Sequence, residues 1–289
     1  METKETVKPL HNAVEDLIES LNRGEKVGFP SGFAAHDSLV GTFLPGTLNL
    51  VAARPGMGKT AYLLSMAIHQ ASLGIKALFF SLEIDSSQVA ARVLAIKSGV
   101  SLMRLLRREI STEEVQSIMD ILPEVRSIPV DLDSETIQLR EICDTISRNV
   151  EAGSQTCVFI DYIGLVSIKG MDSDRYELIG TTTRTFKLLA KKLRVPFVVA
   201  CQLNRGTEYR KNKEPMLADL RESGELENHA DMVMGLIRPA YYLENEEDGK
   251  PADPRLLYVY VMKNRHGPTG RYSLDWDGTC AAIKDRNFE

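Results

Sequence analysis

The sequence ARPGMGKT at residues 53–60 stands directly between a strand pattern and a helix pattern. The run TLNLVAA at 47–53 is typical of a buried strand, and TAYLLSMAIHQASL at 60–73 has helical spacing. A loop in this position can turn its backbone N–H groups and the N-terminus of the next helix toward an anion. Because Gly56 and Gly58 permit such a backbone, the stretch predicts a phosphate cradle.

Two side chains of this loop carry the chemistry that a nucleotide needs. Lys59 is placed to reach the terminal phosphates, and Thr60 offers a hydroxyl to Mg²⁺. The strict pattern opens with Gly, whereas this position is Ala53. A chance Gly-rich turn is the alternative, and the flanking strand and helix argue against it. The residues expected to bind ATP, or another nucleoside triphosphate, are Ala53, Arg54, Pro55, Gly56, Met57, Gly58, Lys59, Thr60 and Ala61.

Strand and helix patterns alternate along the rest of the chain. Strands are expected at 76–81, 157–161, 196–202, 231–237 and 256–262, and 269–276 alternates like an antiparallel partner. Helices are expected at 86–99 with Ser86 as N-cap, and at 112–121, 135–149 and 177–193. Apolar strands separated by helices predict an α/β fold, a mostly parallel central sheet flanked by helices, with a C-terminal antiparallel hairpin.

Polar residues follow three of these strands at their carboxyl ends, where parallel sheets bind ligands. Glu83 follows FFS, Asp161 ends CVFI, and Gln202 follows VVAC. A carboxylate here can hold Mg²⁺, a second can polarise an attacking water, and an amide can sense the terminal phosphate. Each alone is also compatible with a helix cap or a solvated loop. Because all three residues are expected at the same edge of the sheet, a nucleotide-binding site is favoured over these alternatives.

Two later segments are not needed by a nucleotide pocket. QLNRGTEYRKNKEP at 202–215 is basic, and it contributes to a set of cations that can face nucleic-acid phosphates: Arg205, Arg210, Lys211, Lys213 and Arg221. A solvated charged loop is the alternative. VMKNRHGPTG at 261–270 projects Lys263 and Arg265 from one side of a strand next to a Gly-Pro turn. This suits an arginine finger given to a neighbour, or an ordinary edge strand protected by charge.

The composition is that of an ordinary globular protein, with 43% apolar and 26% charged residues. No apolar run can span a bilayer, and the charged N-terminus METKETVKPL is no secretory signal. Four dispersed cysteines without metal-binding spacing indicate thiols in a reducing cytoplasm. With 35 basic and 40 acidic residues the net charge is −5, so nucleic acid can be bound only through local basic loops.

Six blocks, in this order and spacing, resemble the RecA-like motor domain of the DnaB-like family of bacterial and phage replicative helicases. The likeness runs from about Gly28 to Phe288. The blocks are ARPGMGKT, FSLEI (80–84), VFIDYIGL (158–165), ACQLNR (200–205), DLRESGELENHAD (219–231) and KNRHGPTG (263–270). The family commonly has Ala at the first loop position, as at Ala53.

The resemblance implies a RecA-like P-loop NTPase that hydrolyses ATP with Mg²⁺. It also implies 5′→3′ movement on single-stranded DNA by a six-membered ring that unwinds duplex DNA at a fork, with primase and a helicase loader as further partners. By matching positions, the resemblance implies that Lys59 and Thr60 bind phosphate and Mg²⁺, that Asp161 is the Mg²⁺ carboxylate, and that Glu83 is the water-activating base. Gln202 matches the γ-phosphate sensor, and Lys263 and Arg265 match the pair that reaches the adjacent subunit. Arg221, Glu222 and Gly224 match the loop that follows the DNA backbone.

The chain departs from the family's pattern at several positions, and two other functions are alternatives to this hypothesis. Gly164 stands where the family usually has Gln, and Gly56 replaces a common Ser. The family's N-terminal collar is not matched. Residues 1–27 resemble only the family's linker helix and connector, and residues 28–289 resemble its motor domain. In the linker helix, one face carries Val14, Leu17, Ile18 and Leu21.

The main alternative function is a RecA-like ATP switch or recombinase-type ATPase that does not unwind DNA. A third possible function is an ATP-dependent helicase loader.

Overall fold

A nine-stranded sheet forms the centre of the computed structural model, which describes residues 9–25, 27–171, 174–210, 212–220, 223–242 and 251–286. The strands are β1 (Leu48–Ala53), β2 (Lys76–Ser81), β3 (Val130–Asp133), β4 (Thr156–Asp161), β5 (Phe197–Gln202), β6 (Met232–Ile237), β7 (Leu256–Asn264), β8 (Gly270–Asp277) and β9 (Ala282–Asp285). Their order in the sheet is β3-β2-β4-β5-β1-β6-β7-β8-β9. β1 to β6 are parallel, whereas β7, β8 and β9 pair antiparallel, so the predicted sheet and C-terminal hairpin are confirmed.

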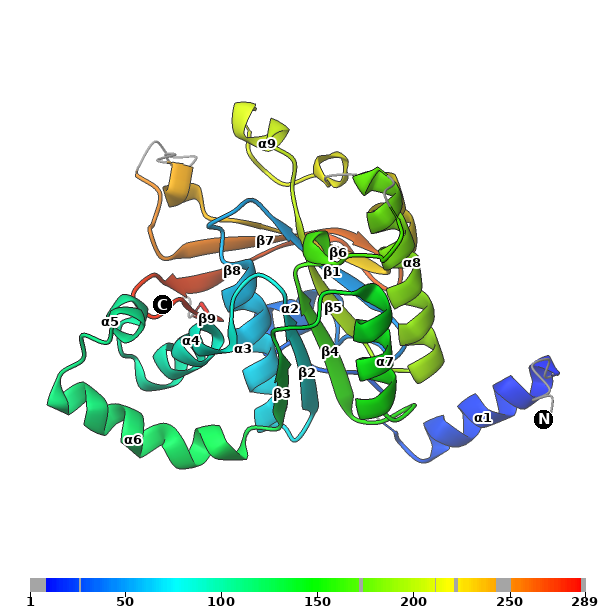
Figure 1. Cartoon of the computed structure of the whole chain (residues 1–289). Helices are drawn as coiled ribbons and strands as arrows, with labels where there is room; N and C mark the ends of the chain where they lie inside the picture. The colour runs from blue at the N-terminus through cyan, green and yellow to red at the C-terminus, as the bar shows by residue number, and fades with distance from the viewer. Residues whose placement is uncertain are drawn as a thin grey trace.

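Helices cover both faces of this sheet (Figure 1). They are α1 (Leu10–Asn22), α2 (Ala34–Val40), α3 (Lys59–Ser72), α4 (Ser86–Ser98), α5 (Leu102–Arg107), α6 (Thr112–Ser127), α7 (Leu139–Asn149), α8 (Arg175–Leu193), α9 (Gly206–Tyr209) and α10 (Ser223–His229). α3 and α4 pack into one apolar cluster, α7 and α8 into the other. Among the described residues, no helix is long and apolar enough to cross a membrane.

The position of β1 between the two layers explains its apolar sequence. Leu48, Leu50 and Ala52 belong to the cluster under α7 and α8, whereas Val51 and Ala53 belong to the cluster under α3. Successive side chains of a strand point to opposite faces, so a strand covered on both sides must be apolar at nearly every position. β1 therefore delivers the loop at 54–58 from the middle of the core.

Two local expectations were wrong at helix ends. α4 is capped by Asp85, not Ser86, because the Asp85 carboxylate accepts the N–H of Gln88 at 2.9 Å. α7 begins at Leu139 and not at 135, because Asp133 accepts the N–H groups of Glu135 and Thr136 and holds a turn there. The segment between α1 and β1 contains a further helix, α2, which was not predicted.

α1 extends away from the rest of the molecule (Figure 1) and buries none of its residues. The apolar side chains of this helix are exposed: Leu10, Val14, Leu17, Ile18 and Leu21. An exposed apolar stripe of this kind is unusual for a chain that acts alone and indicates a surface for another protein.

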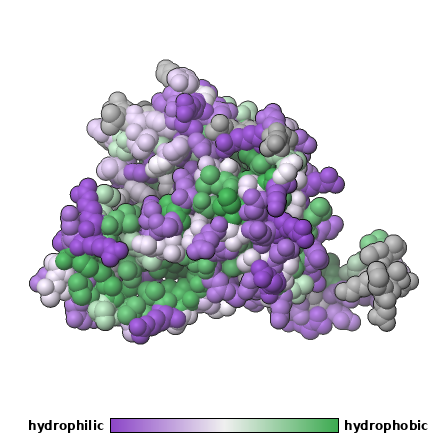
Figure 2. All heavy atoms as spheres, viewed as in Figure 1, coloured by the Kyte–Doolittle hydropathy of each residue, from purple (hydrophilic) through white to green (hydrophobic). Residues whose placement is uncertain are grey.

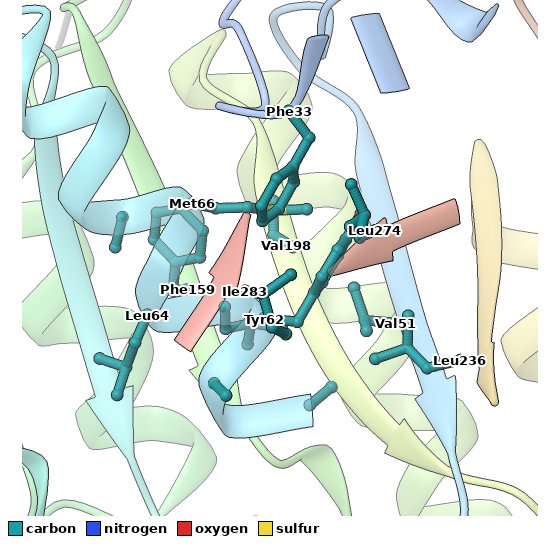
Figure 3. Packing of buried hydrophobic residues seen from close by; sticks show 14 of the residues in the cluster. Phe33, Val51, Tyr62, Leu64, Met66, Phe159, Val198, Leu236, Leu274 and Ile283 are labelled. Carbon is teal, nitrogen blue, oxygen red and sulfur yellow. The ribbon is translucent and has the colours of Figure 1, made fainter. Parts of the chain in front are cut away.

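A buried hydrogen-bonded chain crosses the core between α2, α3 and β8. His36 Nδ1 lies 2.8 Å from the Tyr272 hydroxyl, and the Tyr62 and Tyr272 hydroxyls are 2.6 Å apart. Tyr62 also stacks on Phe33, with ring centroids 5.0 Å apart (Figure 3). These hydrogen bonds join the segment before β1 to the C-terminal hairpin, so that segment is part of the core.

Burial lowers the pKa of His36 from 6.5 to about 4. Between pH 6.5 and pH 4, His36 therefore takes up a proton in the unfolded chain but not in the folded chain. The free energy of unfolding should fall as pH drops from about 6.5 to 4, by about 3 kcal/mol at about 1.4 kcal/mol per pKa unit. His36→Asn, which keeps a polar group toward Tyr272, should remove this part of the slope in denaturant titrations at pH 7 and pH 4. The exposed His11→Asn is the matched control, and an unchanged slope in His36→Asn contradicts the assignment.

Candidate nucleotide site

The phosphate loop folds because two glycines adopt left-handed backbone angles. Gly56 has φ 79° and Gly58 has φ 99°, values that side chains rarely allow. Met57 between them is buried and anchors the loop in the core. Gly58 is the N-cap of α3, so the first N–H groups of α3 open toward the loop. The predicted cradle is thus present in outline.

Thr60 and Asp161 join the first turn of α3 to the end of β4. The Thr60 hydroxyl donates to Asp161 Oδ2 at 2.6 Å. Asp161 is fully buried, and its Oδ1 has no hydrogen-bond partner. Burial raises the pKa of Asp161, although the Thr60 hydrogen bond and the Lys59 charge lower it. A buried carboxylate oxygen without a partner is a free ligand position.

Lys59 lies beside this pair. Its Nζ donates to the carbonyl of Ala53 at 3.3 Å, folding the side chain back over the loop. Burial lowers the pKa of Lys59, and the carboxylates of Asp161 and Glu83 oppose that shift. The ammonium is therefore poorly compensated without an anion in the cradle.

A cavity of about 260 Å³ brings the predicted residues together. Sheet register places Ser81 level with Asp161 and Ala53 level with Gln202, so β2, β4, β1 and β5 all end at this edge. The cavity is lined by Pro55, Gly56, Gly58, Lys59, Thr60, Ala61, Glu83, Ile84, Arg92, Tyr162, Gln202 and Trp276. Asp161 lies beneath it, bonded to Thr60.

The residues at this edge fit Mg²⁺ as well as phosphate. Mg²⁺ takes oxygen ligands and is usually held by one or two carboxylates together with substrate phosphates. Thr60 and Asp161 supply a hydroxyl and an unpartnered carboxylate oxygen. Among the described residues, no group of three or more His, Cys, Asp or Glu side chains is placed to hold a metal without a nucleotide.

Four residues that line the cavity were not predicted from the sequence: Ile84, Arg92, Tyr162 and Trp276. Arg92 enters from α4 with a buried Nε that has no partner, and burial lowers its pKa while Asp161 and Glu83 raise it. Tyr162 covers Gly164, where any side chain would collide with the Tyr162 ring. The ring thus occupies the place where the family's usual Gln would stand. The available signal for Arg92 was an arginine inside the otherwise apolar run 89–96 of α4.

Trp276 lines the cavity, and most of its side chain is buried. A side chain at Gly58 would meet its ring at 2.9 Å. The Arg238 guanidinium stacks 4.3 Å from the ring centroid, and Arg238 Nη1 donates to the Gly56 carbonyl at 3.2 Å. Arg238 and Trp276 also line a second cavity that adjoins the first. The pair offers a flat surface next to the phosphate loop.

Arg54 is not in the cavity, although the sequence placed it among the nucleotide contacts. Its Nε donates to Glu208 Oε1 at 2.7 Å and its Nη1 to the Leu203 carbonyl at 2.9 Å. Ala53 and Met57 are also buried beneath the loop and do not line the cavity. These three residues shape the loop from behind.

Lys263 and Arg265 lie at the opposite edge of the sheet. β7 runs antiparallel to β6, so its end at Asn264 pairs with Met232 at the start of β6. Because β6 is parallel to β1, this edge is opposite to the one where the phosphate loop follows the end of β1. Lys263 Nζ donates to the carbonyl of Glu227, and Arg265 Nη2 to the carbonyl of Asn228, at the end of α10. Both cations therefore share one side, and neither is near the cavity of its own chain.

The residues predicted to follow DNA lie around α9 and α10. Arg205 is exposed at the start of α9, which projects from the carboxyl edge of the sheet (Figure 1). Gly224 lies in the first turn of α10, where a side chain would meet the Tyr176 hydroxyl. Arg221, Glu222 and Lys211 lie outside the described residues.

The parallel sheet, the glycine-rich loop at the start of α3 and the polar strand ends define a RecA-like P-loop protein. The family model described as the DnaB-like helicase C-terminal domain matches residues 28–285. The chain therefore belongs to the DnaB-like helicase C-terminal domain family.

Curated proteins with similar sequences are named as replicative DNA helicases. The chain is 31% identical over 287 residues to the replicative DNA helicase DnaB of Leifsonia xyli subsp. xyli, covering 96% of this chain and 61% of that one. It is 33% identical over 262 residues to a probable replicative DNA helicase of Trieres chinensis, covering 89% and 57%. It thus spans about three fifths of the length of the curated relatives it matches.

Two solved structures share the fold over nearly the whole chain. One, described as an ATPase domain, has a TM-score of 0.88 at 26% identity, covering 97% of this chain and all of that one. The other, a DnaB-like replicative helicase solved in a study of its interactions with primase, has a TM-score of 0.85 at 26% identity, covering 99% and 68%.

Trp276 is the chain's single tryptophan, so its fluorescence should report nucleotide binding directly. MgATP added to the protein should change the emission, because phosphates enter within reach of the ring that touches Gly58. The titration is measured by emission at fixed protein concentration. Trp276→Phe should abolish the signal, and Lys59→Ala should shift the titration to higher ATP. Unchanged emission at ATP concentrations where calorimetry shows binding would place the nucleotide elsewhere.

Proposed function

We propose that this chain is the ATP-hydrolysing motor of a ring-shaped replicative DNA helicase that moves 5′→3′ on single-stranded DNA and unwinds duplex at the fork. One observation carries the proposal: Lys59, Thr60, Glu83 and Gln202 meet around one cavity above the buried Asp161. The family and the names of the relatives favour this function over a RecA-like switch without unwinding.

Each side chain has a distinct task in the proposed reaction. Lys59 neutralises the terminal phosphates, and Thr60 with Asp161 holds Mg²⁺, which when bound offsets negative charge on the phosphates. Glu83, exposed at the cavity just beyond β2, orients and deprotonates the attacking water. Gln202 senses the γ-phosphate from the end of β5. Arg238 and Trp276 flank the base, for which their stacked pair provides a surface.

The ring is proposed from features at both ends of the chain. Lys263 and Arg265 are at the wrong edge of the sheet for their own cavity, so they serve the neighbour's. The exposed apolar face of α1 needs a partner, and apolar side chains gather over α4, α5 and α6 (Figure 2). The exposed ones there are Met103, Leu106, Val115 and Met119.

An apolar cavity of about 370 Å³ lies beneath that surface, between α3, α4, α6 and β2. It is lined by apolar side chains that include Ile68, Phe79, Val93 and Leu122. We place the α1 of a neighbouring chain on this surface, with residues 1–27 as linker and 28–289 as motor. Each apolar α1 side chain would contribute about 1.5–3 kcal/mol if fully buried.

Other parts of the proposal follow from the family. The DNA lies against Arg205, Arg221, Glu222 and Gly224, with its phosphates near the basic residues. Primase, with which one of the solved relatives interacts, and a helicase loader are the proteins to test against assembled rings. The protein works in the cytoplasm, where the DNA is replicated.

Strand displacement tests the function. With ATP and Mg²⁺ the chain should release a labelled strand from a fork with a 5′ single-stranded tail, and not from one with only a 3′ tail. Lys59→Ala should lose ATP turnover and displacement while circular dichroism shows a folded chain, because the cradle then lacks its cation. ATP hydrolysis at the wild-type rate by Lys59→Ala would overturn the site.

A mixing experiment tests the contribution of the neighbour. A finger cation supplied in trans is worth about 10³–10⁵ in rate, because it offsets charge that develops in the transition state. Lys59→Ala chains and Arg265→Ala chains should each be inactive alone. Mixed rings should regain turnover where an intact loop meets an intact finger. No recovery at any ratio, in chains shown to co-assemble by mass photometry, would mean that Arg265 does not act in trans.

A further inference from the structure

The phosphate loop is tied directly to the segment that follows β5. Arg54, the first residue after β1, turns its guanidinium away from the cavity. The guanidinium donates to Glu208 on α9 and to the carbonyl of Leu203, just beyond Gln202. The Leu203 N–H in turn donates to the Ala53 carbonyl at 3.1 Å. One side chain thus links the loop that cradles phosphate to α9.

A second ion pair continues this connection toward residue 221. Arg210, directly after α9, lies 2.6 Å from the buried carboxylate of Asp219. The Asn204 N–H donates to the Asp219 carbonyl at 2.8 Å, and Leu203 pairs with Leu220. The two ends of the segment 203–220 are therefore held together, and the segment ends at the residue that precedes Arg221.

The first pair is placed to respond to charge in the cradle. The Arg54 side chain is 10% exposed and the Glu208 side chain 37% exposed, so water screens the pair only in part. Arg54 is also close enough to Lys59 that its positive charge lowers the pKa of the lysine. A phosphate bound at Lys59 therefore attracts the same guanidinium that Glu208 holds. Since an ion pair responds to a charge placed near one partner, we expect a bound phosphate to weaken the hold of Glu208 on Arg54.

We propose that the Arg54–Glu208 pair couples nucleotide binding at the phosphate loop to single-stranded DNA binding by the segment after β5. Glu208 is then a positioning residue, which touches neither ligand. The inference rests on the proposed function and adds the residue pair that connects its two sites. A link of this kind has a measurable strength, because each ligand must change the affinity of the other by the same factor.

The experiment measures that factor in assembled rings. Fluorescence anisotropy gives the Kd of a labelled oligo-dT strand with Mg²⁺, with and without a non-hydrolysable ATP analogue. The reciprocal titration gives the Kd of the analogue with and without oligo-dT. Coupled sites commonly show a ratio of about 5- to 150-fold, and the wild-type chain should fall in this range. In Glu208→Gln, both ratios should fall to within about twofold of one, while each ligand still binds alone.

A matched control removes a similar ion pair far from both sites. Lys76 at the start of β2 and Asp131 on β3 are 2.7 Å apart, so Asp131→Asn should leave the ratio at the wild-type value. Arg54→Lys keeps a positive charge but loses the planar fork that reaches Glu208 and Leu203 together. If the pair is the link, the double variant Arg54→Lys/Glu208→Gln should show the same ratio as Glu208→Gln alone.

The outcomes separate this inference from the function on which it rests. Glu208→Gln that melts near the wild-type temperature and keeps the wild-type ratio overturns the link. So does a wild-type chain that binds both ligands with a ratio of one. If the melting temperature of Glu208→Gln falls, Arg54→Lys replaces it as the test. A ratio near one in folded Arg54→Lys supports the link, and a wild-type ratio in that variant overturns it. A wild-type chain that binds no nucleotide or no oligo-dT refutes the proposed function itself.

Discussion

The register of the parallel strands is the constraint on which the site depends. Because β1, β2, β4 and β5 run the same way, their carboxyl ends meet at one edge, where β5 extends past the end of β4. Residues far apart in the chain then become neighbours: Thr60 reaches Asp161 at 2.6 Å across 101 positions. The apolar faces of the strands fix this register, since a shift by one residue would turn every buried side chain to the wrong layer.

The same sheet separates the two halves of the proposed catalytic machinery. The cavity lies at the carboxyl edge of β1, and the cations of β7 lie at the amino edge. Asp231 holds that second edge together: it accepts the Leu48 N–H at 2.8 Å and the Lys187 ammonium at 2.6 Å. Arg265 approaches the same carboxylate at 3.6 Å. A chain built this way cannot bring its own Arg265 to its own phosphates without unfolding, so in the proposed function the ring supplies what one chain lacks.

The strands and the polar residues at their ends could be predicted from the sequence, because burial on both faces leaves a strong apolar pattern and the loop glycines have a definite conformational need. Side-chain direction could not be predicted. Arg54 turns to Glu208 across 154 positions, and Tyr162 occupies the room above Gly164. Trp276 on β8 contacts Gly58, and Arg92 enters from α4. Each of these depends on contacts between distant elements, which local spacing does not encode.

The cavity is built at the expense of the fold's own electrostatics. Burial raises the pKa of Asp161 and lowers the pKa of Lys59, so the folded chain disfavours the charged form of both groups. The proposed function needs both charged. A phosphate beside Lys59 and a cation at the unpartnered Asp161 oxygen would each relieve one of these costs. Nucleotide binding then recovers energy that folding has already stored at this edge of the sheet, which is the general advantage of a preorganised polar site over one that must form around its ligand.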